Sequence, residues 1–146
     1  MQIFAVGGGG FTHPEDNYPH DAILEDHLLA LAGPTAQVSI GYIGHASNDN
    51  PAKIEMFYKR FDGCANITTL PLEANLTEAR GFLNDLDILY VGGGATKKML
   101  AHWQRTGICK ILLEAAHGGV ILSGVSAGAI CWFSELLLGS AKDGYT

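Results

Sequence analysis

Short apolar runs alternate along this chain with longer segments whose apolar residues follow helical spacing. The runs QIFAV, QVSIGYI, DILYV and VILSG are apolar almost throughout, as is typical of strands that are buried on both faces of a sheet. Residues 66–70 predict a further, weaker strand. Glycine or polar turn residues follow these runs, so the pattern predicts strands that are joined through helices.

The segments between the runs predict the helices. The first helix is predicted by residues that follow helical spacing, namely Ile23, Leu24, His27, Leu28 and Leu31. Further helices are predicted after Pro51, around residues 77–83, 95–104 and 108–117, and from residue 127 through Trp132 and Phe133. This alternation predicts a three-layer α/β/α domain with a mostly parallel, flavodoxin-like sheet. Chemistry in such sheets lies at the carboxyl ends of the strands, which is where the glycine clusters fall.

Composition narrows the function classes. The 146 residues suit one domain, residues 1–146, and 47% hydrophobic against 16% charged residues indicates a globular chain. A net charge of −6 without a Lys/Arg cluster argues against a nucleic-acid partner. Three cysteines without a CxxC pair favour free thiols in the cytoplasm over disulfides or a zinc site. We find neither a signal peptide nor an apolar run of ~18 residues, so we expect no membrane partner.

The segment VILSGVSAGAICWF carries the strongest chemical signal. A buried strand ends, and Gly124 and Gly128 flank Ser126 in a G-x-S-x-G pattern before a helix begins. That pattern is typical of an elbow that exposes a serine hydroxyl as a nucleophile. The N–H of Ala127 would then face a developing oxyanion. The alternative is that Ser126 merely caps the helix.

A second glycine cluster, in LYVGGGATKKML, follows another predicted strand. Its successive backbone N–H groups could form half of an oxyanion hole, cradle a phosphate or only make a tight turn. The first cluster, VGGGGFTH, does not fit a dinucleotide fingerprint, because G-x-G-x-x-G would require glycine in place of Thr12. A nucleotide- or acyl-phosphate-binding domain is therefore the weaker alternative.

These two motifs together resemble the peptidase E (S51) family of serine peptidases, within the class I glutamine amidotransferase-like superfamily. The matching pieces are residues 92–96, GGGAT, and residues 124–129, GVSAGA. Residues 44–47, GHAS, fall where the family has a segment of small residues. Related amidotransferases have cysteine at the elbow, so Ser126 indicates peptidase chemistry.

The resemblance implies a function and a set of site residues. Ser126 matches the nucleophile, and Gly93, Gly94 and Ala127 match the oxyanion hole. Asp143 is a weak candidate for the acid of the triad. The implied activity is hydrolysis of small peptides or dipeptides through an acyl-enzyme, with no metal or cofactor. The alternative is a non-catalytic protein of the same fold that binds a small ligand.

The chain departs from the family pattern after the elbow. The family's catalytic histidine lies downstream of its serine, whereas no histidine follows Ser126 here. We therefore expect that the C-terminal part of the family domain is missing from this chain. A homodimer, or association with that missing segment, would cover the sheet edge that this leaves exposed. His13 and His45 lie on loops at the catalytic edge and are candidates for lining the substrate.

Overall fold

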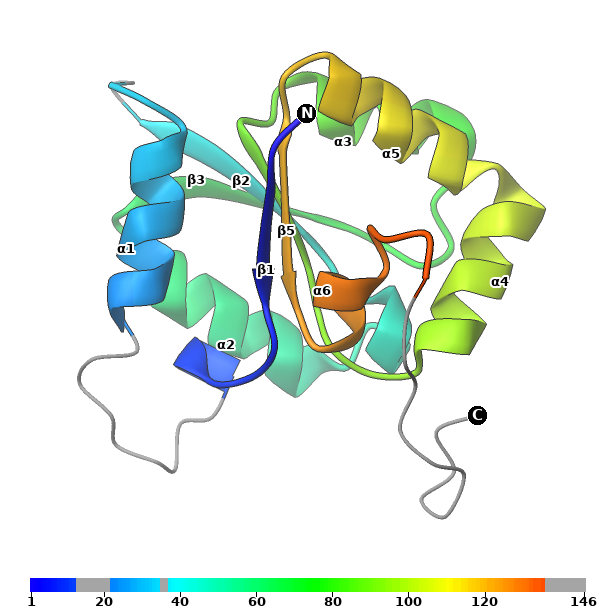
Figure 1. The fold of residues 1–146 in the computed structure, drawn as a ribbon, viewed down its shortest axis with the longest axis horizontal. Helices are drawn as coiled ribbons and strands as arrows, with labels where there is room; N and C mark the ends of the chain where they lie inside the picture. Colours follow the sequence, from blue (N-terminus) through cyan, green and yellow to red (C-terminus); the bar gives the residue numbers. More distant parts are fainter. Residues whose placement is uncertain (13–21, 35–36, 136–146) are drawn as a thin grey trace.

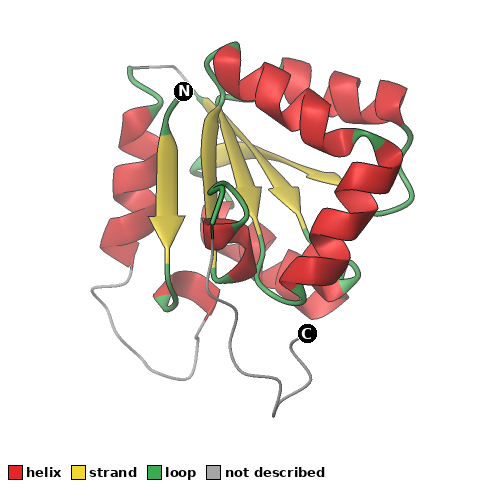
Figure 2. Ribbon diagram, turned by 45° about the vertical axis from the view of Figure 1, so that its right-hand side comes forward, coloured by secondary structure: helices red, strands yellow, loops and turns green. Residues whose placement is uncertain are grey.

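The computed structural model describes residues 1–12, 22–34 and 37–135, which form a parallel sheet covered by helices on both faces (Figures 1 and 2). The strands are β1 (Ile3–Val6), β2 (Val38–Ile43), β3 (Ala65–Leu70), β4 (Ile88–Val91) and β5 (Ile121–Val125). Their spatial order is β1-β5-β4-β2-β3, and every neighbouring pair is parallel. The predicted α/β class is therefore confirmed, and the carboxyl ends of the strands share one edge.

Helices cover the two faces of the sheet as separate layers. The first layer contains α1 (Ala22–Leu31) and α2 (Pro51–Phe61), and the second contains α3 (Leu76–Asn84), α4 (Thr96–Thr106) and α5 (Ile108–His117). A short helix, α6 (Ala127–Ile130), follows β5, and single 3₁₀ turns are η1 (Gly10–Thr12) and η3 (His45–Ser47).

Local sequence signals fix where two of these helices begin. Pro51 occupies the first turn of α2, and the Asn50 side chain accepts a hydrogen bond of 3.0 Å from the Ala52 N–H. Asn75 and Glu78 form a reciprocal capping box at the start of α3. Both helices therefore begin within one or two residues of the predicted positions.

Each face of the sheet has its own apolar core. Leu28 of α1 and Phe57 and Phe61 of α2 pack on one face, and all three side chains are fully buried. Met99 and Trp103 of α4 pack on the other face, together with residues of α3 and α5. Because both faces are covered, the strands need apolar residues at successive positions, which explains their unbroken apolar runs.

The first predicted helix is confirmed as α1, whereas the helix predicted after the elbow is shorter than expected. On α1, Ile23 and Leu24 are 61% and 37% exposed, while Glu25 is buried, with a carboxylate oxygen 3.6 Å from Nε of Arg60. A charge pair therefore occupies part of the inward face of α1. The helix after the elbow ends at Ile130 and does not continue to Phe133, and the chain turns there as the Trp132 ring packs 6.1 Å from that of Trp103.

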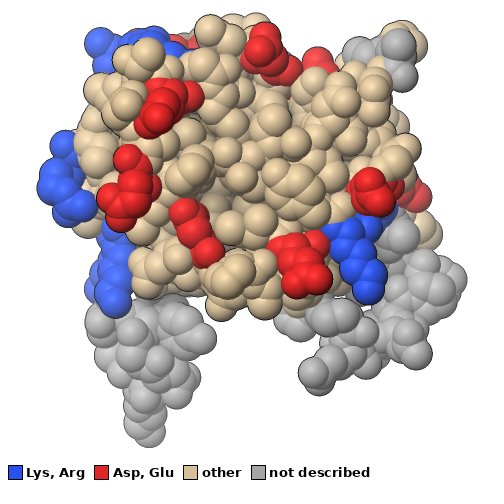
Figure 3. Space-filling view, turned by 180° about the vertical axis from the view of Figure 1, so that it is seen from behind, with Lys and Arg blue, Asp and Glu red and all other residues tan. Residues whose placement is uncertain are grey.

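Charged side chains are dispersed over the face seen in Figure 3. Lysine and arginine lie in separate groups toward the rim, with acidic residues among them and an uncharged region between. The described part of this face therefore shows no continuous basic surface. Among the described residues, no helix is both long enough and apolar enough to cross a bilayer.

Candidate active site

A sharp turn at Ser126 joins β5 to α6. Its φ of 54° and ψ of −113° lie where a residue with a Cβ is rarely found. The Ser126 N–H donates to the Val6 carbonyl of β1 at 3.0 Å, and its carbonyl accepts from Ala129 N–H at 3.0 Å. The side chain is exposed although Val125 and Ala127 are buried, and it forms no cap hydrogen bond with α6. The structure therefore has the elbow, and the helix-cap alternative is not what it shows.

Glycine on both sides of Ser126 allows the elbow to pack against β4. A Cβ built on Gly128 would overlap the Val91 carbonyl oxygen, and one built on Gly124 would come within 2.5 Å of both that oxygen and the Gly128 oxygen. Real Cβ atoms do not approach backbone atoms so closely. Helix α6 can therefore start directly above the sheet only because both positions lack a side chain.

The loop after β4 lies against the elbow on one side and against η3 on the other. A Cβ on Gly93 would lie 3.2 Å from the Ser126 Cβ and 3.7 Å from its hydroxyl oxygen. Gly94 has a φ of 151°, and a Cβ there would overlap the carbonyl of Ala46. That same carbonyl accepts a short hydrogen bond, 2.7 Å, from Ala95 N–H. The structure thus brings Gly93 next to Ser126, as the order of β5, β4 and β2 requires.

The amides of the predicted oxyanion hole have no partner in the described part of the chain. Neither Gly93, Gly94 nor Ala127 donates its N–H to another described residue. Unpaired backbone N–H groups near a reactive hydroxyl can bind the oxyanion of a tetrahedral intermediate. Ala127 N–H also lies at the amino end of α6, next to Ser126.

The structure places His45 in the core and not on the surface beside Ser126. Its side chain is 2% exposed, and its Nδ1 accepts a hydrogen bond of 3.0 Å from the indole N–H of Trp103. Because an indole only donates, the ring proton lies on Nε2, which donates to the Leu70 carbonyl at 3.1 Å. Both ring nitrogens are thus hydrogen-bonded within the protein, so in this structure His45 does not line a substrate site as predicted. The ring instead holds η3 against Trp103 and Leu70.

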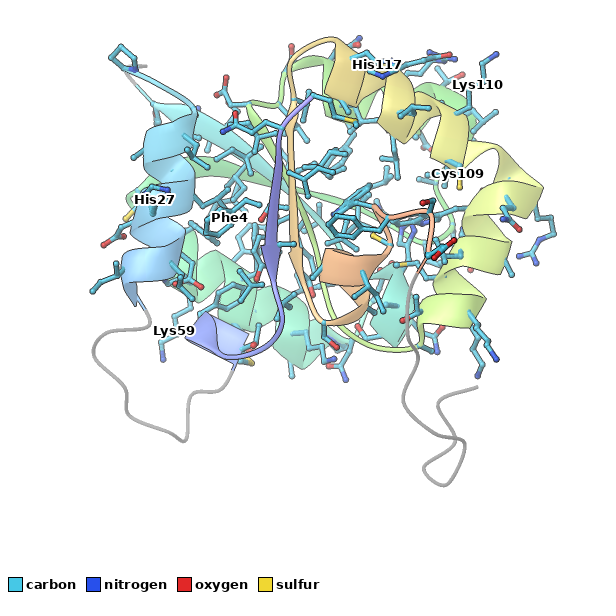
Figure 4. All side chains as sticks on the ribbon, in the orientation of Figure 1. Phe4, His27, Lys59, Cys109, Lys110 and His117 are labelled. Carbon is cyan, nitrogen blue, oxygen red and sulfur yellow. The ribbon has the colours of Figure 1, made fainter. Side chains whose placement is uncertain are left out.

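The other predicted site residues and the remaining histidines lie elsewhere. His13 and Asp143 are outside the described residues. His27 lies on α1 with its ring 5.9 Å from that of Phe4, and His117 ends α5 ahead of the start of β5 (Figure 4). His102 packs edge-on against His45 at 5.5 Å. Within the described ranges, no histidine nitrogen is hydrogen-bonded to Ser126.

The thiols near the elbow are poor nucleophiles. Burial raises the pKa of Cys131, which follows α6, to about 12, and also raises the pKa of Cys109. A thiol reacts as the thiolate, so Cys131 stays unreactive near neutral pH. No group of three or more His, Cys, Asp or Glu side chains among the described residues could hold a metal ion.

The supporting role of the Ala46 carbonyl was missed by sequence reasoning. The GHAS segment resembles the family by its small residues. In the structure, its contribution is the Ala46 carbonyl, which accepts a hydrogen bond from Ala95 N–H and lies against Gly94. No side-chain pattern encodes a carbonyl. Only the small size of Ala46 and Ser47, which follow β2, could have indicated that the loop after the neighbouring strand β4 packs closely against this segment.

His45 predicts a pH-dependent contribution to stability. Burial is the main cause that lowers its pKa below 6.5, with His102 adding to it and with Asp49 and the backbone carbonyls opposing it. As the pH falls below 6.5, the unfolded chain takes up a proton that folded His45 refuses, so the free energy of unfolding decreases. We expect a loss of about 1 kcal/mol per pH unit until the folded pKa is reached.

Urea denaturation of the wild type and His45→Gln between pH 7.5 and 5 measures this contribution as a difference in slope. The difference is needed because Glu25 also titrates differently in the folded protein. Burial raises its pKa, so between pH 4.5 and that raised pKa the free energy of unfolding increases as the pH falls, opposite to the contribution of His45. His117→Gln changes an exposed histidine at the end of α5 and serves as the control. Equal slopes for the wild type and His45→Gln would contradict the prediction.

Comparison with known proteins agrees with the fold and the motifs. The model of peptidase family S51 matches residues 3–145. The uncharacterized peptidase YgaJ of Bacillus subtilis (strain 168) is 35% identical over 145 residues, which are 96% of this chain and 60% of YgaJ. This chain therefore spans less than two thirds of that relative.

Two solved structures are also similar. One is a Listeria monocytogenes EGD-e protein named provisionally as a peptidase E, with a TM-score of 0.60 and 27% identity over 71% of this chain and 54% of that one. The other is a peptidase from an acI-B1 Actinobacterium, with a TM-score of 0.67 and 20% identity over 88% of this chain and 55% of that one. At this identity the similarity supports the fold alone. Taken with the elbow at Ser126, the family match over nearly the whole length shows that this chain belongs to peptidase family S51.

Proposed function

We propose that this chain carries the nucleophile and the oxyanion-binding amides of a serine-type peptidase that acts on small peptides. One observation carries the proposal: the exposed Ser126 hydroxyl stands on a positive-φ elbow, next to Gly93 of a loop with unpaired amides. A non-glycine residue in that conformation costs about 1–3 kcal/mol, and such strain is found mostly at functional sites. Membership of a peptidase family supports the same chemistry.

The proposed reaction proceeds through an acyl-enzyme. The Ser126 oxygen attacks the peptide carbonyl carbon while a base removes the hydroxyl proton, and the carbonyl oxygen becomes an oxyanion. Gly93 or Gly94, together with Ala127, donates N–H groups to that oxygen. The proton passes to the departing amine, and the C–N bond breaks. Water then attacks the ester on Ser126, which releases the acid and restores the hydroxyl.

We place the base outside the described residues. A serine hydroxyl is a weak nucleophile until a neighbouring base accepts its proton. The buried His45 cannot be that base in this conformation, because Nδ1 accepts from Trp103 and Nε2 bears the proton. We propose a histidine with an acid partner, for which Asp143 is the candidate, and expect neither metal nor cofactor.

A fluorophosphonate probe tests the proposal directly. Its phosphorus takes the place of the substrate carbonyl, so rapid labelling requires both an activated serine and donors for the phosphoryl oxygen. We expect one label, mapped by peptide mass spectrometry to Ser126, and none in Ser126→Ala. Ser123→Ala is the matched control, since Ser123 is fully buried in β5, the strand that leads into the elbow. Because the base is placed outside the described residues, the full-length gene product is used; if it is folded and stays unlabelled, the result contradicts a peptidase and favours a ligand-binding protein of the same fold.

A further inference from the structure

Lys53 of α2 reaches across to the loop after β4. Its ammonium nitrogen donates to the Gly93 carbonyl oxygen at 3.0 Å, although the two residues are 40 positions apart. The contact is possible because β2, which leads into α2, pairs directly with β4. Lys53 therefore joins α2 to the loop that borders Ser126.

The position of this lysine is unfavourable for the helix itself. Lys53 lies in the first turn of α2, which begins at Pro51. The amino end of a helix carries partial positive charge, so a cation there is disfavoured, whereas acidic residues are favoured. A residue that opposes the local preference points to a role outside the helix.

The Gly93–Gly94 peptide needs an external anchor. Both residues that flank it lack a Cβ, so side-chain sterics do little to select one orientation of the peptide plane. The next amide is already held, because Ala95 N–H donates to the Ala46 carbonyl at 2.7 Å. Among the described residues, the hydrogen bond recorded for the Gly93 carbonyl comes from Lys53.

The rigidity of the peptide transmits this contact to the proposed oxyanion donor. A trans peptide is planar, so the Gly93 C=O and the Gly94 N–H point in opposite directions and rotate together. The described chain contains no cis peptide bond. A cation that holds the oxygen therefore also fixes the direction of the N–H. The charged hydrogen bond polarises the peptide as well, which makes the N–H a stronger donor.

We propose that Lys53 is a positioning residue, which orients the Gly94 N–H toward the oxyanion by holding the Gly93 carbonyl. This inference rests on the proposed function, since it assigns Lys53 to the same oxyanion hole. Lys53 does not act on the substrate itself in this scheme. It acts through one peptide unit.

Labelling kinetics with the fluorophosphonate test this role. Lys53→Met removes the donor and keeps most of the apolar stem, and we expect the maximal labelling rate to fall roughly tenfold, less than the loss of a whole oxyanion-hole donor. The probe concentration at half-maximal rate and the melting temperature should stay near the wild-type values. Lys53→Arg keeps a cationic donor and should restore most of the rate.

Lys59→Met is the control on the same helix. Lys59 is exposed near the other end of α2 (Figure 4), so its variant should label at the wild-type rate. Wild-type labelling in Lys53→Met, or an equal loss in Lys53→Met and Lys53→Arg, would overturn the role of Lys53 and leave the peptidase proposal intact. All variants are made in the full-length gene product, and failure of the unmutated full-length protein to label would overturn both.

Discussion

Gly128→Ala should lower the free energy of unfolding by at least about 3 kcal/mol, above the usual range for overpacking. The added Cβ would overlap the Val91 carbonyl oxygen and lie 2.9 Å from the Val91 Cβ. Val91 is the last residue of the central strand β4, which pairs with both β2 and β5. Neither the strand nor α6 can move aside without breaking that pairing or displacing Ser126.

Gly81→Ala provides the matched control for this prediction. Gly81 lies within α3, where a Cβ would meet no atom within 4 Å and φ is not positive. The same substitution should there stabilise the protein by up to about 1 kcal/mol, because alanine is the better helix former. Chemical denaturation of the three proteins measures both effects. A Gly128→Ala variant as stable as the wild type would show that α6 does not pack on Val91 as described.

The elements of this fold that could be predicted from sequence are those whose signal is local. Apolar runs that end in glycine predicted the strands of a sheet covered on both faces, and Pro51 marked the start of a helix. The elbow could be located because it needs small residues at fixed spacing around Ser126. Strand order then brings the loop after β4 beside that elbow.

The features that could not be predicted depend on contacts between distant residues. His45 looks like a loop histidine in the sequence, but Trp103, 58 positions later, supplies the hydrogen bond that makes it part of the core. Glu25 lies inside because Arg60 and the loop after β1 face it. The hydrogen bond from Lys53 to Gly93 has no sequence signature either, since it joins a side chain to a backbone carbonyl.

Gly94→Ala should reduce fluorophosphonate labelling of Ser126 by roughly a hundredfold or more, the usual loss when an oxyanion-hole donor is removed. A Cβ at this position would overlap the Ala46 carbonyl oxygen and approach Ser47 N to 3.1 Å, and the φ of 151° is itself unfavourable for alanine. The loop must therefore lift away from η3. That movement breaks the bond from Ala95 N–H to Ala46 and displaces the Gly94 N–H, the proposed oxyanion donor.

Gly7→Ala separates this effect from a general response of the catalytic edge. Gly7 follows β1 at the same edge, and a Cβ there would meet nothing within 4 Å, so this variant should label at the wild-type rate. Melting temperatures of both variants show how much of the loss comes from unfolding. Because the loop is anchored on η3 whereas Ser126 is held by β1 and α6, Gly94→Ala should leave the elbow folded and the hydroxyl exposed. A folded Gly94→Ala variant that labels within about threefold of the wild type would therefore exclude this loop from the stabilisation of the oxyanion.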